Sequence, residues 1–280
     1  MKIYRRGYLG VEYKGFLETH DIKHEAWPPD SKSGVKEIDS YMFEITENNP
    51  VWPKIETFLK GDHTYVRTHF TDEERLDAEW CLVWGHHLIV SYRIPKGNAW
   101  SEEYFTNSCG NCGVGWKQIA PFRLKQEPKQ GRNQFCGFGG GFELFCTPLV
   151  LEEFARHGIT GFETWPVLLK KKGNEQAQNL KQIIVTEMAE AAIAKELVEH
   201  VSYSRNVCPV CGQTWHAHYA RGMLPLRRAA LKPNVDFQLT NEWFGNDSSA
   251  RHEILVSQRV VRLIFENKWK GVELVPIQGV

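Results

Sequence analysis

Four of the seven cysteines stand in two copies of one short motif, Cys-x-x-Cys-Gly. The copies are residues 109–113 and 208–212, and each places two thiols three positions apart in front of a glycine. This spacing is typical of a tight knuckle that points both sulfur atoms at one metal ion, and two such knuckles complete a tetrahedral site. The pattern predicts one structural Zn²⁺ bound by Cys109, Cys112, Cys208 and Cys211.

Other interpretations of the two motifs are a redox pair, separate disulfides, two separate half-sites or no metal. A redox Cys-x-x-Cys begins a helix, whose N-terminus lowers the thiol pKa. Neither Gly113-Val114-Gly115 nor Gln213-Thr214-Trp215 looks like the start of such a helix. The odd number of cysteines also fits reduced thiols better than a disulfide framework. A shared zinc site is therefore favoured.

Two histidines close behind the second motif offer a different ligand set. His216 and His218 could replace Cys109 and Cys112 in a local site with two cysteines and two histidines. The intervals after Cys211 are too short for the helix of a zinc finger, so four thiolates remain the preferred set. A closed shell of four thiolates leaves no position for water or substrate, which makes the predicted site structural.

No motif in the chain predicts an active site. The glycine-rich stretch 137–143 lacks the Lys-Ser or Lys-Thr of a phosphate-binding loop and leads into an expected strand, so we interpret it as a bulge or turn. The hydrolase, metalloprotease and deaminase signatures are also missing from the sequence. Cys81, Cys136 and Cys146 lie among apolar neighbours and are expected in the core. We expect a protein that is not an enzyme.

The composition is that of an ordinary globular protein. Of 280 residues, 42% are hydrophobic and 24% charged, and 34 basic residues balance 34 acidic ones. Without a net charge there is no general attraction to a polyanion, so nucleic acid is an unlikely partner. No apolar run approaches the length of about 18 residues that a membrane span requires. The basic N-terminus is not followed by the apolar run of a signal peptide either. We expect a cytoplasmic protein that does not bind a membrane.

The local patterns predict an α+β protein of mixed sheets with short helices. Residues 41–45 and 64–68 look like strands, and Pro53 and Gly61 bracket a short helix. Thr71 and Glu74 form a capping box, which predicts a helix that turns Leu76, Trp80 and Val83 or Trp84 inward. Residues 183–186 are strand-like, and residues 187–200 are rich in helix formers.

The chain also contains a repeat. Leu144, Gly161 and Pro166 recur as Ile254, Gly271 and Pro276, each at an offset of 110 positions. Each copy predicts a strand, a helix capped by a hydroxyl residue (Thr147 or Ser257), a glycine, and a strand that ends in proline. The expected organisation is an N-terminal α+β region, 1–105, and a region 106–280 in which a zinc-ribbon-like clasp joins duplicated units at 134–170 and 244–280.

The combination of these features resembles the double-CXXCG family of bacterial immunity proteins. It rests on the two Cys-x-x-Cys-Gly motifs and the repeat ends at 161–167 and 271–277, and covers roughly residues 60–280. The resemblance implies a cytoplasmic protein that binds a cognate protein toxin and neutralises it by occlusion, without chemistry of its own.

The alternative is a zinc-ribbon protein that binds nucleic acid. Residues 117–133 carry five basic side chains against one acidic one, and Trp116, Phe122 or Phe135 could stack on bases. Such a run is more often a solvated surface.

Overall fold

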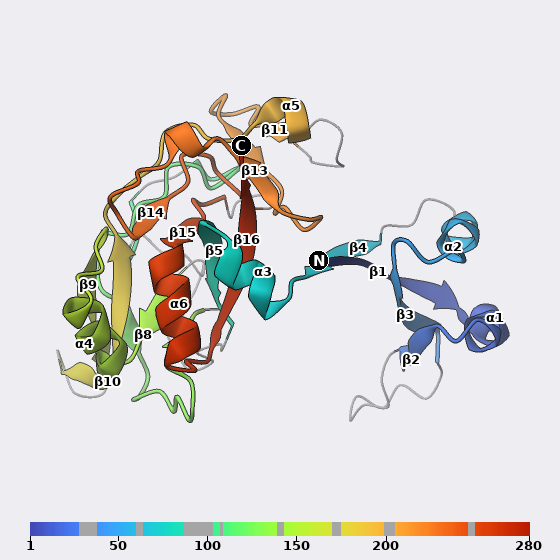
Figure 1. The fold of residues 1–280 in the computed structure, drawn as a ribbon, viewed down its shortest axis with the longest axis horizontal. Helices are drawn as coiled ribbons and strands as arrows, with labels where there is room; N and C mark the ends of the chain where they lie inside the picture. Colours follow the sequence, from blue (N-terminus) through green and yellow to red (C-terminus); the bar gives the residue numbers. More distant parts are fainter. Residues whose placement is uncertain are drawn as a thin grey trace. The chain divides into compact units, whose positions relative to one another are not determined.

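The computed structural model describes residues 1–27, 38–59, 64–86, 103–106, 109–138, 143–169, 175–198, 205–245 and 250–280. In these residues the chain has an α+β fold, with most strands in four sheets and with short helices (Figure 1). It divides into two compact units, one of residues 1–71 with 219–222 and one of residues 72–218 with 223–280. This division falls at Thr71, so residues 72–105, which we assigned to the N-terminal region, lie in the second unit. No helix in the described part of the chain is long and apolar enough to span a membrane.

The first unit is a four-stranded antiparallel sheet with two helices. Its elements follow the order βαββαβ, and its strands lie in the order β2-β3-β1-β4, which is the ferredoxin-like arrangement. The expected strands at 41–45 and 64–68 and the short helix after Pro53 are confirmed as β3, β4 and α2. The bounds are β1 Lys2–Gly10, η1 Val11–Tyr13, α1 Lys14–Thr19, β2 Lys23–Trp27, β3 Ser40–Thr46, α2 Trp52–Phe58 and β4 Tyr65–His69.

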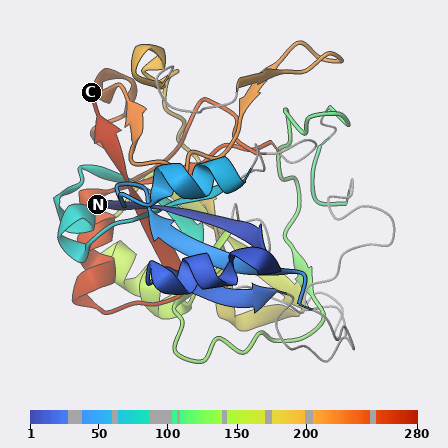
Figure 2. The same ribbon diagram turned by 90° about the vertical axis from the view of Figure 1, so that its right-hand side faces the viewer.

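Both helices of this unit pack on the same face of the sheet (Figures 1 and 2). Alternate side chains of a strand point to opposite faces, and the buried set from β1 and β3 meets α1 and α2. This core consists of Leu9, Leu17, Ile22, Phe43, Ile45, Trp52, Ile55 and Leu59. The opposite face of the sheet carries no described helix.

The second unit contains two five-stranded sheets of matching design, in the orders β6-β9-β10-β8-β7 and β13-β16-β5-β15-β14. The bounds of the first are β6 Arg123–Leu124, β7 Phe135–Cys136, β8 Leu144–Cys146, β9 Phe162–Leu169 and β10 Gln176–Val185. Those of the second are β5 Trp80–Gly85, β13 Leu224–Leu226, β14 Phe237–Leu239, β15 Ile254–Ser257 and β16 Val272–Gly279. The remaining elements are α3 Asp72–Asp77, α4 Pro148–Arg156, α5 Lys195–Val198, η3 Arg228–Ala230, α6 Gln258–Glu266 and the pair β11 Arg205–Val207 and β12 Thr214–His216.

Each sheet takes its central strand from the start of the other repeat. β5 precedes the first knuckle in the sequence but lies between β15 and β16, whereas β10 follows the first copy and lies between β8 and β9. The registers are equivalent, because Lys181 faces Cys146 and Pro166 as Cys81 faces Val256 and Pro276. The duplication therefore begins at β5 and β10, and the two repeats exchange their first strands.

The predicted strand-helix-strand repeat is confirmed, down to the backbone conformation. Gly158 follows α4 with φ 59°, and Lys268 takes the same left-handed conformation after α6 with φ 53°. Gly161 and Gly271, with φ of 92° and 89°, also match. A Cβ atom on either glycine would collide with a carbonyl oxygen of the other repeat, that of Phe237 for Gly161 and of Phe135 for Gly271. These glycines allow the two repeats to approach closely.

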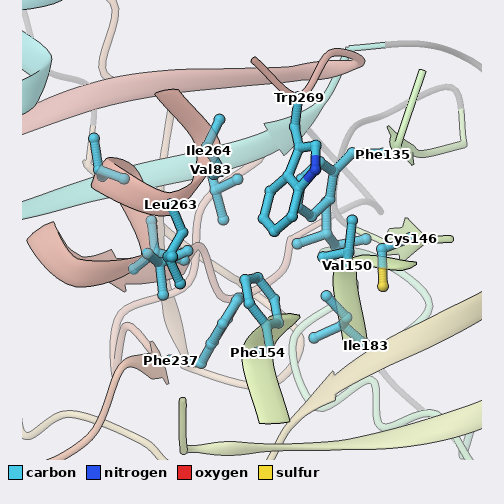
Figure 3. Close-up of a cluster of buried hydrophobic side chains, with 14 of the residues drawn as sticks. Val83, Phe135, Cys146, Val150, Phe154, Ile183, Phe237, Leu263, Ile264 and Trp269 are labelled. Atoms are coloured by element: carbon cyan, nitrogen blue, oxygen red, sulfur yellow. The ribbon is translucent and has the colours of Figure 1, made fainter. Parts of the chain in front are cut away.

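The two repeats share a hydrophobic core. Figure 3 shows Phe154 of α4 between Phe237 of β14 and Trp269, with ring centroids 5.6 and 5.8 Å apart. Phe135 of β7 in turn contacts Trp269 edge to face. The cluster includes buried residues of both central strands, Val83 and Ile183. The second unit thus contains a core built from both repeats.

Three sequence expectations were wrong in this unit. The helix that begins after Thr71 ends at Asp77, and Trp80–Gly85 is a strand, because these residues are nearly all buried at the centre of a sheet. Residues 187–194 are not helical either: Met188 forms a bridge with Leu239 and Ile193 with Leu226, and only α5 remains helical. Pro166 and Pro276 lie within β9 and β16, and not at their ends.

The predicted caps stand at the right positions but do not cap through their hydroxyl groups. Thr147 and Ser257 are the N-cap residues of α4 and α6, and neither side chain bonds to its helix. The Ser257 hydroxyl donates to Asp236 Oδ1 at 2.6 Å instead. Gly61, the glycine expected after α2, and part of the glycine-rich stretch lie outside the described residues.

Candidate metal centre

The four predicted cysteines come together in one cluster. Cys109 Sγ lies 3.7 Å from Cys208 Sγ, and Cys112 Sγ lies 3.6 Å from Cys211 Sγ. All four sulfur atoms lie within 4.8 Å of one another, and among the described residues this is the one group of three or more His, Cys, Asp or Glu side chains close enough to hold a metal ion. The cluster could hold one ion.

The sulfur positions fit a tetrahedral thiolate site. With Zn–S bonds of about 2.3 Å, neighbouring sulfur atoms of a regular tetrahedron stand about 3.8 Å apart. The two cross-repeat distances of 3.7 and 3.6 Å agree with that edge. They are far longer than a disulfide bond of about 2.0 Å, and all seven cysteines are free thiols.

The cysteines are positioned by two knuckles with the same backbone hydrogen bonds. In the first, Cys109 N donates to Val114 O and Gly113 N donates to Cys109 O. In the second, Cys208 N donates to Gln213 O and Gly212 N donates to Cys208 O, each at an offset of 99 positions. Gly113 and Gly212 have φ of 75° and 71°, a conformation that favours glycine and explains the glycine after each second cysteine.

Hydrogen-bond donors surround the sulfur of Cys208. Burial opposes ionisation of this thiol, but backbone N–H groups of Cys211 and Val210 and the Asn111 amide outweigh it and lower its pKa to about 6. Asn111 Nδ2 lies 3.3 Å from the sulfur and comes from the other knuckle. Donors of this kind orient and stabilise thiolate ligands. The spacing of the cysteines did not predict this hydrogen bond from Asn111 to a cysteine of the other motif.

Apolar side chains enclose the other side of the cluster. Cys112 is fully buried and packs with Val114, Trp215 and Ala250, and Trp243 lies against this group. Burial raises the pKa of Cys112 to about 12 when no metal ion is bound. Cys211 is exposed, so the site is accessible to solvent on one side and covered by apolar side chains on the other.

Neither histidine joins the cluster. His216 is buried with its ring 5.7 Å from that of Phe244. His218 Nδ1 lies 3.0 Å from Glu253 Oε1, and the second oxygen of that buried carboxylate accepts from Trp84 Nε1. The structure thus places both imidazoles in contacts that do not involve the four thiols.

The remaining three cysteines are core residues, as expected. Cys81, Cys136 and Cys146 are fully buried, and burial raises the thiol pKa of each, to about 12 for Cys81 and Cys136. Gln130 Nε2 donates to the Cys136 sulfur at 3.3 Å. None of them lies in the cluster of four cysteines.

The basic segment 117–133 presents cations but few rings. Lys117, Lys125 and Lys129 are exposed. Phe122 and Phe135, however, are 4% and 1% exposed and belong to the core, so they cannot stack on bases. Trp116 lies under the guanidinium of Arg251. The aromatic part of the nucleic-acid alternative is therefore absent from this segment.

Comparison with known proteins identifies no family for this chain. Neither the known protein families nor the curated proteins include a match to it.

Proposed function

We propose that this chain is an immunity-type binding protein that neutralises a cognate protein toxin by occlusion, and that one Zn²⁺ holds its second unit in shape. The observation that carries the proposal is the meeting of two Cys-x-x-Cys-Gly knuckles, one from each repeat, in a single cluster. Four thiolates would complete the coordination of zinc and leave no place for a substrate. The ion would therefore act as a structural link.

The role of the ion follows from what it would connect. Cys109 and Cys112 belong to the first repeat, and Cys208 and Cys211 belong to the second, so the bound ion would fix the repeats to each other. A rigid surface lowers the loss of conformational entropy on binding a partner. The resemblance to immunity proteins rests on this same combination of two Cys-x-x-Cys-Gly motifs and two duplicated units.

The test is coexpression with the product of the neighbouring toxin gene. The proposal predicts that the chain restores growth and copurifies with the toxin in a stable complex. Cys112→Ser should lose protection together with zinc, whereas Cys146→Ala, a change at a buried thiol outside the cluster, should keep both. Failure of the unmodified chain to bind the toxin or to restore growth would contradict the proposal.

A further inference from the structure

The exposed face of the sheet in the first unit is built from alternating positions of all four strands. Leu9 and Phe43 point toward α1 and α2, so the residues before and after them point the other way. On β2 and β4, Lys23, Glu25 and Trp27 and likewise Tyr65, Arg67 and His69 are exposed, while the residues between them are partly buried. Within the first unit, no described helix covers this face.

Cations and rings alternate on the β1–β4 half of this face. The register pairs Lys2 with His69, Tyr4 with Arg67 and Arg6 with Tyr65. Each pair therefore contains one cation and one ring, and the cation lies alternately on β1 and on β4. Directly paired side chains on neighbouring strands lie about 5 Å apart, so every ring in this array has a cation beside it.

The other half of the face extends the rings. Tyr8 and Trp27 stand edge to face with centroids 5.6 Å apart, and Trp27 is 43% exposed. The acidic residues of the face are Glu25 and Glu44, and Glu44 bonds to Arg6 at 2.9 Å. Against these two stand four cations, Lys2, Arg6, Lys23 and Arg67, so the face is basic although the whole chain is neutral.

We propose that this face binds single-stranded RNA, through base stacking on Tyr4, Tyr65 and Trp27 and phosphate contacts with Lys2 and Arg67. Four-stranded sheets with open aromatic faces bind unpaired bases in this way, and neighbouring cations contact the backbone. Lysine is depleted in protein interfaces, whereas this face carries two lysines, Lys2 beside His69 and Lys23 on β2. Tyrosine hydroxyl groups, with Ser40 and Thr46 on β3, suit the 2′-hydroxyl that distinguishes RNA from DNA.

RNA binding by this face would be a function in addition to toxin neutralisation, and it does not depend on that proposal. The test measures binding of the full chain to a labelled oligouridine of about 12 nucleotides by fluorescence anisotropy, from about 50 to about 200 mM salt. Binding should weaken as salt rises. Arg67→Ala should reduce the slope of log affinity against log salt by about 0.7, the contribution of one phosphate contact to a single strand.

Tyr65→Ala removes a ring that is 67% exposed, so it should leave folding intact and weaken binding about 5-fold or more. Tyr65→Phe keeps the ring and should retain most of the affinity. The matched control, Lys125→Ala with Lys129→Ala, removes two exposed cations of the second unit and should change little.

Four results would overturn the inference: no binding of the oligouridine, affinity that does not depend on salt, equal or tighter binding of oligothymidine, or loss of binding in the lysine control alone. Loss of a protein complex in Tyr65→Ala without RNA binding by the unmodified chain would assign the face to a protein partner and would also overturn it.

Discussion

Cys109 and Cys208 occupy the same position in the two repeats of the second unit, and their sulfur atoms lie 3.7 Å apart. Cys112 and Cys211 are related in the same way, at 3.6 Å. The cluster therefore lies where the two repeats face each other with equivalent residues. The same symmetry relates the contacts of Gly161 with Phe237 and of Gly271 with Phe135. The strand exchange and the cysteine cluster both follow from the way in which the two duplicated units face each other.

The glycines at the contact between repeats should not tolerate a side chain. Gly161→Ala and Gly271→Ala each add a Cβ that meets a backbone carbonyl of the other repeat and that also disfavours the positive φ. We expect each change to lower the free energy of unfolding by about 2 kcal/mol or more. Urea denaturation followed by circular dichroism measures this.

The control for this prediction is Gly158→Ala. Gly158 has φ 59° but open space around its Cβ position, so it tests backbone strain alone and should lose about 1 kcal/mol. Equal losses in Gly158→Ala and Gly161→Ala would show that close approach of the repeats is not the reason for the glycine.

The exchanged strands should keep a cut chain together. A protease site placed within residues 170–174 would separate β9 from β10, and with them the two repeats. Each piece would then lack the central strand of its own sheet and obtain it from the other piece. We expect the cleaved protein to elute as one species in size-exclusion chromatography without denaturant. Two separately eluting, folded pieces would contradict the exchange.

Glu47 should stabilise the first unit in a pH-dependent manner. It bonds to Arg5 of β1 and to Arg221, with Arg221 Nη2 2.9 Å from Oε2. Burial opposes ionisation of Glu47, but hydrogen bonds from Arg221 and Arg5 outweigh it and lower its pKa. A lowered carboxyl pKa adds stability above the pKa of the unfolded chain, and this stability is lost as pH falls through the folded pKa.

Glu47→Gln should therefore lower the free energy of unfolding by about 1–3 kcal/mol at neutral pH. The difference from the unmodified protein should become smaller as the pH falls. Thermal melting at a series of pH values measures it. Glu196→Gln is the matched control, because Glu196 also bonds to an arginine, Arg227, but both side chains are more than half exposed. A Glu47→Gln effect that does not change with pH would argue against this role of the ion pairs.

Local patterns predicted the elements whose signals are local. The strand-helix-strand repeat was readable because its helices have one apolar face and its caps and glycines recur at one offset. Trp80–Gly85 was misassigned because a short run that is apolar on every side does not distinguish a central strand from a buried helix. Residues 187–194 have helical propensity, but the chain is not helical there: Glu242 Oε1 accepts the backbone N–H groups of Ala192 and Ile193.

The cysteine cluster could be predicted from cysteine spacing, whereas its surroundings could not. The contact of Asn111 with Cys208 and the packing of Trp243 and Ala250 on the cluster depend on the tertiary fold. The strand exchange could not be predicted from the sequence, since Cys81 and Lys181 hold equivalent registers at an offset of 100 and not at the 110 of the strand-helix-strand units. Which sheet each strand joins, however, depends on packing between the repeats and not on the strand's own residues.

The metal content of purified protein tests the shared site most directly. Elemental analysis should find about one zinc per chain in the unmodified protein and nearly none in Cys112→Ser or Cys208→Ser, because each change removes a ligand of the same ion. Cys146→Ala should retain the full amount. Two zinc ions per chain, or a full or half equivalent retained in either ligand variant, would contradict a single site that joins the two repeats.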